Sequence, residues 1–168
     1  GGEAVTPPGQ PEQPAVVVAL DPGHGGVDPG KVGVNNTLEK DLNLAIAEKV
    51  RARLEAEGIT VVMTREADVG LYQESDRNKK MADLRARCQR IEDSGAALTV
   101  SIHQNSYHDG SVRGPQVFYY QASEQGRQLA EILQSSFDGV TEYNRKVKAN
   151  DNYYLLLHTS CPTAIVEC

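Results

Sequence analysis

Residues 15–26 read Ala15-Val16-Val17-Val18-Ala19-Leu20-Asp21-Pro22-Gly23-His24-Gly25-Gly26. The first half of this stretch is short, apolar and rich in β-branched residues, which predicts a buried strand. The second half is rich in glycine, so it predicts a loop directly after that strand. Because ligands of parallel sheets bind beyond the carboxyl ends of the strands, this loop is the first place to look for a functional site.

The rest of the chain alternates between strand and helix patterns. Apolar residues at three- and four-residue spacing, including Leu42 and Leu54, predict a helix over residues 40–57, and Ile132 is expected to face the core from a later helix. This alternation predicts an α/β fold with a largely parallel sheet. The further elements expected are strands over residues 59–64, 97–103, 116–120, 153–157 and 163–168, and helices over residues 81–94 and 124–137.

The composition indicates one soluble globular domain. The chain has 168 residues, of which 39% are hydrophobic and 24% charged, and this is enough to bury a sizeable core. The net charge of −6 and the pI of about 5.2 argue against a nucleic-acid partner. The longest apolar run, residues 15–20, is far shorter than the roughly 18 residues of a membrane span, so none is expected. Two basic clusters are expected to form solvated surface: Arg77, Lys79, Lys80, Arg85, Arg87 and Arg90, and then Arg145, Lys146 and Lys148.

The ends of the chain and its cysteines carry less information. Residues 1–14 are rich in proline and glycine, which predicts a flexible N-terminal tail ahead of one domain over residues 15–168. No targeting segment is recognisable in the chain. The cysteines are odd in number and form no C-x-x-C pair, which argues against a disulfide framework and a cysteine-based zinc finger. They are Cys88, Cys161 and Cys168.

Four side chains with metal-binding or acid–base chemistry stand at the predicted strand ends. His24 follows the first strand, His103 closes the third, Glu167 closes the last, and Glu39 stands at the start of the first helix. In a parallel sheet, these positions meet at one edge. Catalytic zinc sites typically use three His, Asp or Glu ligands and keep one position for water, a set that His24, Glu39 and His103 supply. Glu167 is then free to act as the general base and later as the general acid.

Each of these residues also has a plainer interpretation. His24, between glycines, fits a turn with positive φ, and Glu167 fits a solvated strand end. Asn36 and Glu39 have the three-residue spacing of a helix capping box, in which Glu39 would serve only the helix start. The zinc hypothesis therefore depends on the convergence of all four residues.

Other polar residues give weaker signals. His103 shares its strand parity with Thr99 and Ser101, so it also fits a merely polar face of the sheet. No G-x-S-x-G motif surrounds Ser101, which argues against a serine hydrolase. His158 and Cys161 have ligand-like spacing but lack a second pair, so they are expected to be structural or surface residues.

Four segments of the chain together resemble a known family, the zinc-dependent N-acetylmuramoyl-L-alanine amidases of bacterial cell walls. The resemblance spans residues 16–168, and the segments occur in the order that the family shows. They are Leu20-Asp21-Pro22-Gly23-His24-Gly25-Gly26, Leu38-Glu39-Lys40-Asp41-Leu42-Asn43-Leu44, Val100-Ser101-Ile102-His103-Gln104-Asn105-Ser106 and Pro162-Thr163-Ala164-Ile165-Val166-Glu167-Cys168.

This resemblance implies both a fold and an activity. The implied fold is a three-layer α/β/α domain with a twisted, mostly parallel six-stranded sheet. The implied activity is hydrolysis of the amide between N-acetylmuramic acid and L-alanine in peptidoglycan. It would use one zinc ion per chain, held by His24, Glu39 and His103, and Glu167 as the catalytic acid and base. The implied location is extracytoplasmic, in a cell wall, a periplasm or a spore cortex.

Three further segments resemble the spore-germination branch of the family. In that branch, the enzyme removes stem peptides so that muramic lactam can form in the cortex. No residue of this chain is assigned to substrate binding, and an activating partner protein is an open alternative. The three segments are residues 70–72, 117–120 and 148–156.

One departure from the family pattern lies at the end of the chain. Family members usually continue past the glutamate into a further loop and helix, whereas this sequence stops at Cys168, so we expect a C-terminally short domain with a less well fixed Glu167. Two other functions stay open from the sequence. The metal set alone also fits a different zinc peptidase or deacetylase of the cell wall, and the early end of the sequence leaves open a muropeptide-binding module without turnover.

Overall fold

The computed structural model describes residues 14–105 and 111–168, so the expected N-terminal tail lies outside the described residues except for Pro14. The predicted alternation of strands and helices is present along these ranges. In chain order, the elements are β1 (Val17–Pro22), a 3-10 turn η1 (Val34–Asn36), α1 (Glu39–Ala56), β2 (Thr60–Met63), α2 (Lys79–Ser94), β3 (Leu98–His103), β4 (Gln116–Tyr120), α3 (Glu124–Ser136), β5 (Lys148–Asn150), α4 (Tyr154–Leu157) and β6 (Thr163–Glu167).

The strands form one six-stranded sheet in the order β2-β1-β3-β6-β4-β5. β1 pairs in parallel with β2 and β3, and β3 pairs in parallel with β6. β4 runs antiparallel to β6, and β5 follows the direction of β4. The carboxyl ends of β1, β3 and β6 therefore lie side by side at one edge, as the mostly parallel sheet predicted from the sequence requires.

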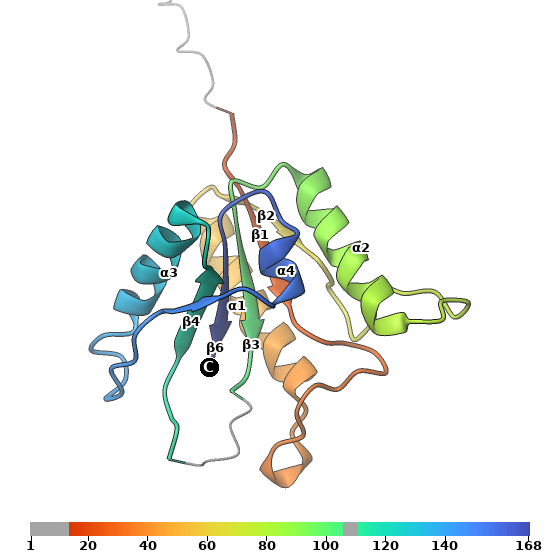
Figure 1. The fold of residues 1–168 in the computed structure, drawn as a ribbon, viewed down its shortest axis with the longest axis horizontal. Coiled ribbons are helices and arrows are strands. Elements are labelled where there is room, and N and C mark those ends of the chain that lie inside the picture. The colour runs from red at the N-terminus through yellow and green to blue at the C-terminus, as the bar shows by residue number, and fades with distance from the viewer. Residues whose placement is uncertain (1–13, 106–110) are drawn as a thin grey trace, which may run out of the picture.

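Helices cover both faces of the sheet, which confirms the three-layer α/β/α prediction (Figure 1). α1 packs on one face against Val18, Leu20 and Ile102, and α3 packs on the same face against Val117 and Val166. α2 and α4 pack on the opposite face, where Cys88, Ile91 and Leu155 meet Ala19 of β1. Neither α1 nor any other helix in the described ranges is long and apolar enough to cross a membrane.

The strand predicted over residues 153–157 is wrong. The chain forms the one-turn helix α4 there, and the strand at this place is β5, a few residues earlier. Leu155 and Leu156 are both buried, and neighbouring residues of a strand cannot both face one side of it. A helical turn directs both leucines toward the sheet, and their burial favours it over the extended form.

Two residues predicted to face the core are exposed. Ile132 is 67% exposed, because the buried side of α3 runs through Ala130, Leu133 and Gln134. Leu42 is 41% exposed, because the buried side of α1 runs through Glu39, Asn43 and Ala47. The spacing of apolar residues predicted both helices correctly, but it did not predict which of their apolar residues face the core.

Candidate metal centre

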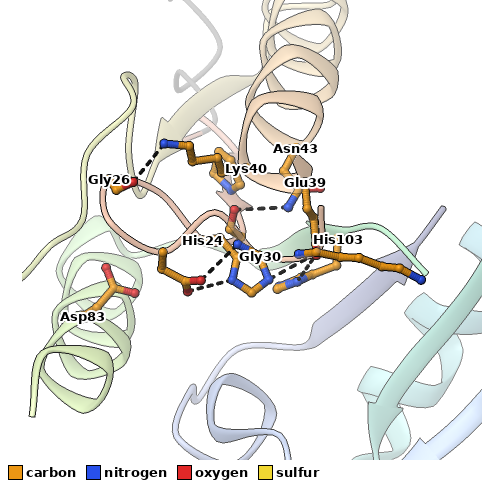
Figure 2. Close-up of polar contacts among 12 residues, drawn as sticks. His24, Gly26, Gly30, Glu39, Lys40, Asn43, Asp83 and His103 are labelled. Carbon is orange, nitrogen blue, oxygen red and sulfur yellow. Dashed lines mark hydrogen bonds and ion pairs between the residues drawn. The ribbon is translucent and has the colours of Figure 1, made fainter. Parts of the chain in front are cut away.

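The four side chains singled out from the sequence line one cavity of about 640 Å³ at the carboxyl edge of the sheet. The backbone N–H of Gly23 donates to the carbonyl of Ile102 at 3.0 Å, so the loop after β1 leaves the sheet beside the end of β3. This contact brings the loop of His24 next to His103. Figure 2 shows the side chains of His24, Glu39 and His103 directed toward one another.

The spacing of these three side chains fits a metal ion. His24 Nε2 and His103 Nδ1 each lie 3.2 Å from Glu39 Oε1, and all three candidate ligand atoms lie within 4.8 Å of one another. Two atoms bound at about 2.0–2.1 Å to a tetrahedral ion are about 3.3 Å apart. Two imidazoles and one carboxylate are also a donor set that zinc favours, so the residues present fit the group that the resemblance implies.

Glu39 is oriented toward the centre by backbone donors. Its carboxylate accepts hydrogen bonds from the N–H of Lys31 at 2.8 Å and of Gln104 at 3.1 Å. Burial raises the pKa of Glu39, but the hydrogen bonds with His103 and His24, together with the two N–H groups, outweigh it and hold the pKa well below its ordinary value. The side chain is therefore a carboxylate, the form that binds a metal.

The capping-box interpretation of Glu39 is wrong. α1 begins at Glu39 itself, its cap residue is Leu38, and no side chain caps this helix start. Asn36 belongs to the 3-10 turn and has a positive φ of 58°. Glu39 is thus the first residue of α1 rather than its third, and its side chain turns into the cavity.

His24 is held from its other ring nitrogen by Asp28, which the sequence did not single out. His24 Nδ1 lies 2.7 Å from Asp28 Oδ2, while Nε2 faces the centre. Burial lowers the pKa of His24, but the carboxylates of Glu39 and Asp28 outweigh this effect and raise it. A carboxylate on the outer nitrogen fixes the ring orientation and makes the inner nitrogen a better metal ligand. The backbone of His24 also has the positive φ of 64° that its glycine-flanked position suggested.

Two glycines allow the loops to approach the centre this closely. A Cβ on Gly30 would lie 2.7 Å from both Glu39 Oε2 and His24 Cδ2, and one on Gly23 would lie 2.3 Å from His103 Cε1. Any larger residue at these positions would displace the ligands.

Two buried arginines hold the loop that carries His24. Arg65 donates to the carbonyls of Pro22 at 2.9 Å and Gly23 at 3.0 Å, and Arg87 donates to those of Pro22 at 2.7 Å and His24 at 2.5 Å. The assignment of Arg87 to solvated surface is therefore wrong, because its side chain is only 2% exposed. Its place among basic residues suggested exposed surface, yet apart from Asp83 in the same helix its partners come from distant elements.

One ion-pair partner of Arg87 is Asp21, the last acidic residue before the loop, and the other is Asp83 of α2, whose Oδ2 lies 2.7 Å from Arg87 Nε. Arg87 NH1 lies 2.9 Å from Asp21 Oδ1, and the Asp21 carboxylate also accepts hydrogen bonds from Ser101 at 2.6 Å and Thr64 at 2.7 Å. Burial raises the pKa of Asp21, but Arg87 and the two hydroxyls outweigh it and lower the pKa to about 2. His103 does share a face with Thr99 and Ser101, as its parity predicted, but those two residues are fully buried, whereas His103 lines the cavity.

Glu167 lies beside His103 because the two residues are register partners in the parallel pairing of β3 and β6. Its register partner on the other side is Gln116 of β4, so the backbone at Glu167 is paired on both sides. Burial raises the pKa of Glu167, against the opposing effect of a hydrogen bond from Tyr153. A raised pKa suits a group that both takes and returns a proton.

Of the remaining candidates, His158 and Cys161 do not line the cavity, and Ser101 lines it without being one of the three side chains at ligand spacing. The ring of His158 packs on that of Tyr154, with 4.0 Å between the centroids, and Cys161 contacts the hydroxyl of Thr99. Ser101 is fully buried and hydrogen-bonded to Asp21. Within the described residues, the group of His24, Glu39 and His103 is the one cluster with metal-binding geometry.

A family of known proteins matches almost all of this domain. The family is described as N-acetylmuramoyl-L-alanine amidase, and the match covers residues 18–168. The chain belongs to this amidase family. The resemblance drawn from the four motifs is therefore confirmed.

The similar curated proteins include a germination-specific member of the amidase family. The germination-specific N-acetylmuramoyl-L-alanine amidase of Bacillus subtilis is 37% identical over 155 residues, which is 90% of this chain and 65% of that protein. The amidase AmiA of Escherichia coli is 34% identical over 142 residues, 83% of this chain and 44% of its own length. The chain thus spans less than two thirds of either curated relative.

Solved structures of amidases are also similar to this chain. The CwlD amidase from Clostridioides difficile, in complex with the GerS lipoprotein, is 37% identical and has a TM-score of 0.87 over 91% of this chain and 81% of that one. The amidase AmiC2 of Nostoc punctiforme is 32% identical, with a TM-score of 0.76 over 90% of this chain and 78% of the other. The sheet order and the covering helices therefore agree with the fold that the motifs implied.

Proposed function

We propose that residues 15–168 are a catalytic domain that hydrolyses the amide between N-acetylmuramic acid and L-alanine in peptidoglycan. The observation that supports it best is the convergence of His24, Glu39 and His103 at ligand spacing, with Glu167 as the register partner of His103 in the same cavity. Membership of the amidase family supplies the bond and the substrate class.

In this proposal, His24, Glu39 and His103 hold one zinc ion. A zinc ion bound there would supply Lewis-acid activation of the amide carbonyl and of the attacking water. Glu167 takes a proton from that water as the C–O bond forms. It then returns the proton to the alanine nitrogen as the C–N bond breaks, which leaves a carboxyl group on the muramic acid and a free amine on the peptide.

The substrate places the proposed reaction outside the cytoplasm, in a cell wall, a periplasm or a spore cortex. The relative CwlD was solved in complex with a lipoprotein, which supports the proposal that a partner protein binds this chain as well. The similarity to germination-specific amidases favours cortex peptidoglycan as the material that it acts on.

Digestion of purified peptidoglycan tests this function. The native chain, loaded with zinc, should release stem peptides whose amino terminus is L-alanine, as measured by mass spectrometry, and a chelator should stop their release. Cleavage only between stem amino acids would show a peptidase, and release of acetate would show a deacetylase. Binding of muropeptide without any product would show a binding module, and each of these three results would overturn the proposal.

Asp28 gives a prediction for the metal site itself. The substitution Asp28→Asn removes the negative charge on His24 Nδ1, so we expect zinc affinity to fall by about 10- to 100-fold. Competition with a chromophoric chelator measures this change. Asp93→Asn, on the exposed surface of α2, is the matched control and should leave the affinity unchanged. Equal affinities for the two variants would show that Asp28 does not support the ligand.

A further inference from the structure

The carboxylate of Glu167 needs more than its strand to be held in place. Pairing of β6 with β3 and β4 fixes the backbone at Glu167. The side chain still has three rotatable bonds, so strand pairing alone does not fix the position of the carboxylate. Within the described residues, 14–105 and 111–168, one hydrogen bond to this carboxylate is present: Tyr153 Oη donates to Glu167 Oε1 at 3.2 Å.

Tyr153 is itself anchored at both ends. Its backbone N–H donates to Asn150 Oδ1 at 2.8 Å, directly before α4. Its ring meets the ring of Phe118 edge to face, with 5.7 Å between the centroids and an interplanar angle of 87°. Phe118 is only 4% exposed, and it pairs with Ile165 on β6, two residues before Glu167. The phenol is thus fixed to the same part of the sheet that carries the carboxylate.

We propose that Tyr153 is a positioning residue for Glu167, in the reaction put forward above. Its hydroxyl holds Oε1, which leaves Oε2 to take the proton from water and return it to the leaving amine. The inference rests on the proposed function, since it assigns a role to Tyr153 through Glu167 and not through any contact with substrate. The sequence pattern did not indicate this role, because it predicted a strand over residues 153–157.

The substitution Tyr153→Phe isolates the hydroxyl, because the ring and its contact with Phe118 remain. A hydrogen bond to a charged group is strong enough that its loss should lower kcat by about tenfold. KM and zinc content should stay within about twofold, since Tyr153 is not proposed to bind either. Tyr119→Phe is the matched control: it removes one hydroxyl from the neighbouring strand β4, but on the face covered by α3.

The decisive measurement is the same substitution in a Glu167→Ala background. If the hydroxyl acts through the carboxylate, Tyr153→Phe should lower the residual kcat by less than about twofold there, because no carboxylate remains to be held. A merely structural role would lower kcat to the same extent in both backgrounds. The melting temperature of each variant separates loss of fold from loss of rate.

The possible results are distinguishable from failure of the proposed function. Native chain that releases no peptide with an L-alanine amino terminus overturns the proposed function, and the role of Tyr153 with it. Native chain that is active, together with an unchanged kcat in Tyr153→Phe or an equal fall in the Glu167→Ala background, overturns the positioning role alone. A fall of about tenfold that disappears in that background supports it.

Discussion

Replacing Glu167 by Gln should lower the rate of amide hydrolysis by about 100- to 10,000-fold, the usual range for a lost general acid–base group. The amide side chain keeps nearly the same shape, and its carbonyl can still accept a hydrogen bond from Tyr153. What it loses is the ability to take a proton from water and return it to the alanine nitrogen. The rate of release of L-alanine amino termini from peptidoglycan measures this effect.

Zinc content shows whether that loss is chemical. Glu167 lies beside His103 in the sheet but is not one of the three side chains at ligand spacing, so Glu167→Gln should bind zinc as the native chain does. Glu48→Gln, on the exposed side of α1, is the matched control and should keep full activity. A variant Glu167→Gln that retains most of its activity would mean that another group moves the proton. One that loses its zinc would make Glu167 a ligand instead.

The second large effect concerns stability. Arg87→Leu should lower the free energy of unfolding by about 3–5 kcal/mol, because it leaves the buried carboxylate of Asp21 without its ion-pair partner. It also removes the hydrogen bonds to the carbonyls of Pro22 and His24, so the loop after β1 loses a support. Urea unfolding near neutral pH, followed by circular dichroism, gives the difference.

Arg85→Leu is the matched control for this prediction, since Arg85 lies two residues away on the exposed side of α2. It should change the free energy of unfolding by no more than about 0.5 kcal/mol. The pH dependence gives an independent check. The pKa of Asp21 is lowered from 3.8 to about 2, so the stability that this carboxylate contributes is present above pH 3.8 and is lost as the pH falls toward 2. The difference in the free energy of unfolding between the native chain and Arg87→Leu should therefore become smaller as the pH falls over that range. A difference in the free energy of unfolding that stays constant with pH would show that Asp21 is not the group left unpaired.

Local sequence patterns were enough for most of the fold. The buried strand at residues 15–20, the helix periodicity and the glycine-rich loop predicted the elements at nearly their observed bounds, and the strand–helix alternation predicted the parallel arrangement. The failures were local as well: residues 153–157 are apolar and aromatic, which suits a strand and a single helical turn equally. Only the need to cover the sheet with both Leu155 and Leu156 decided between them.

The sequence also predicted which four residues meet, because strand ends of a parallel sheet share one edge. His24, Glu39, His103 and Glu167 needed only that topological rule and their chemistry. It could not predict what orients them. Asp28 reaches His24 through an irregular loop, and Tyr153 reaches Glu167 from another element, so neither contact follows from residue spacing.

Arg87 shows the same division between sequence and tertiary structure most clearly. Along the chain it stands among charged neighbours and resembles a solvated helix surface, and its local pattern holds nothing that contradicts this. The tertiary structure instead brings Asp21 and the carbonyl of His24 against it from 66 and 63 residues away. A charge is buried only when distant groups converge to replace its water, and that convergence is a property of the folded chain rather than of any local segment. The sequence by itself determined the elements and the reactive residues, whereas the tertiary structure decided which side chains hold those residues in position.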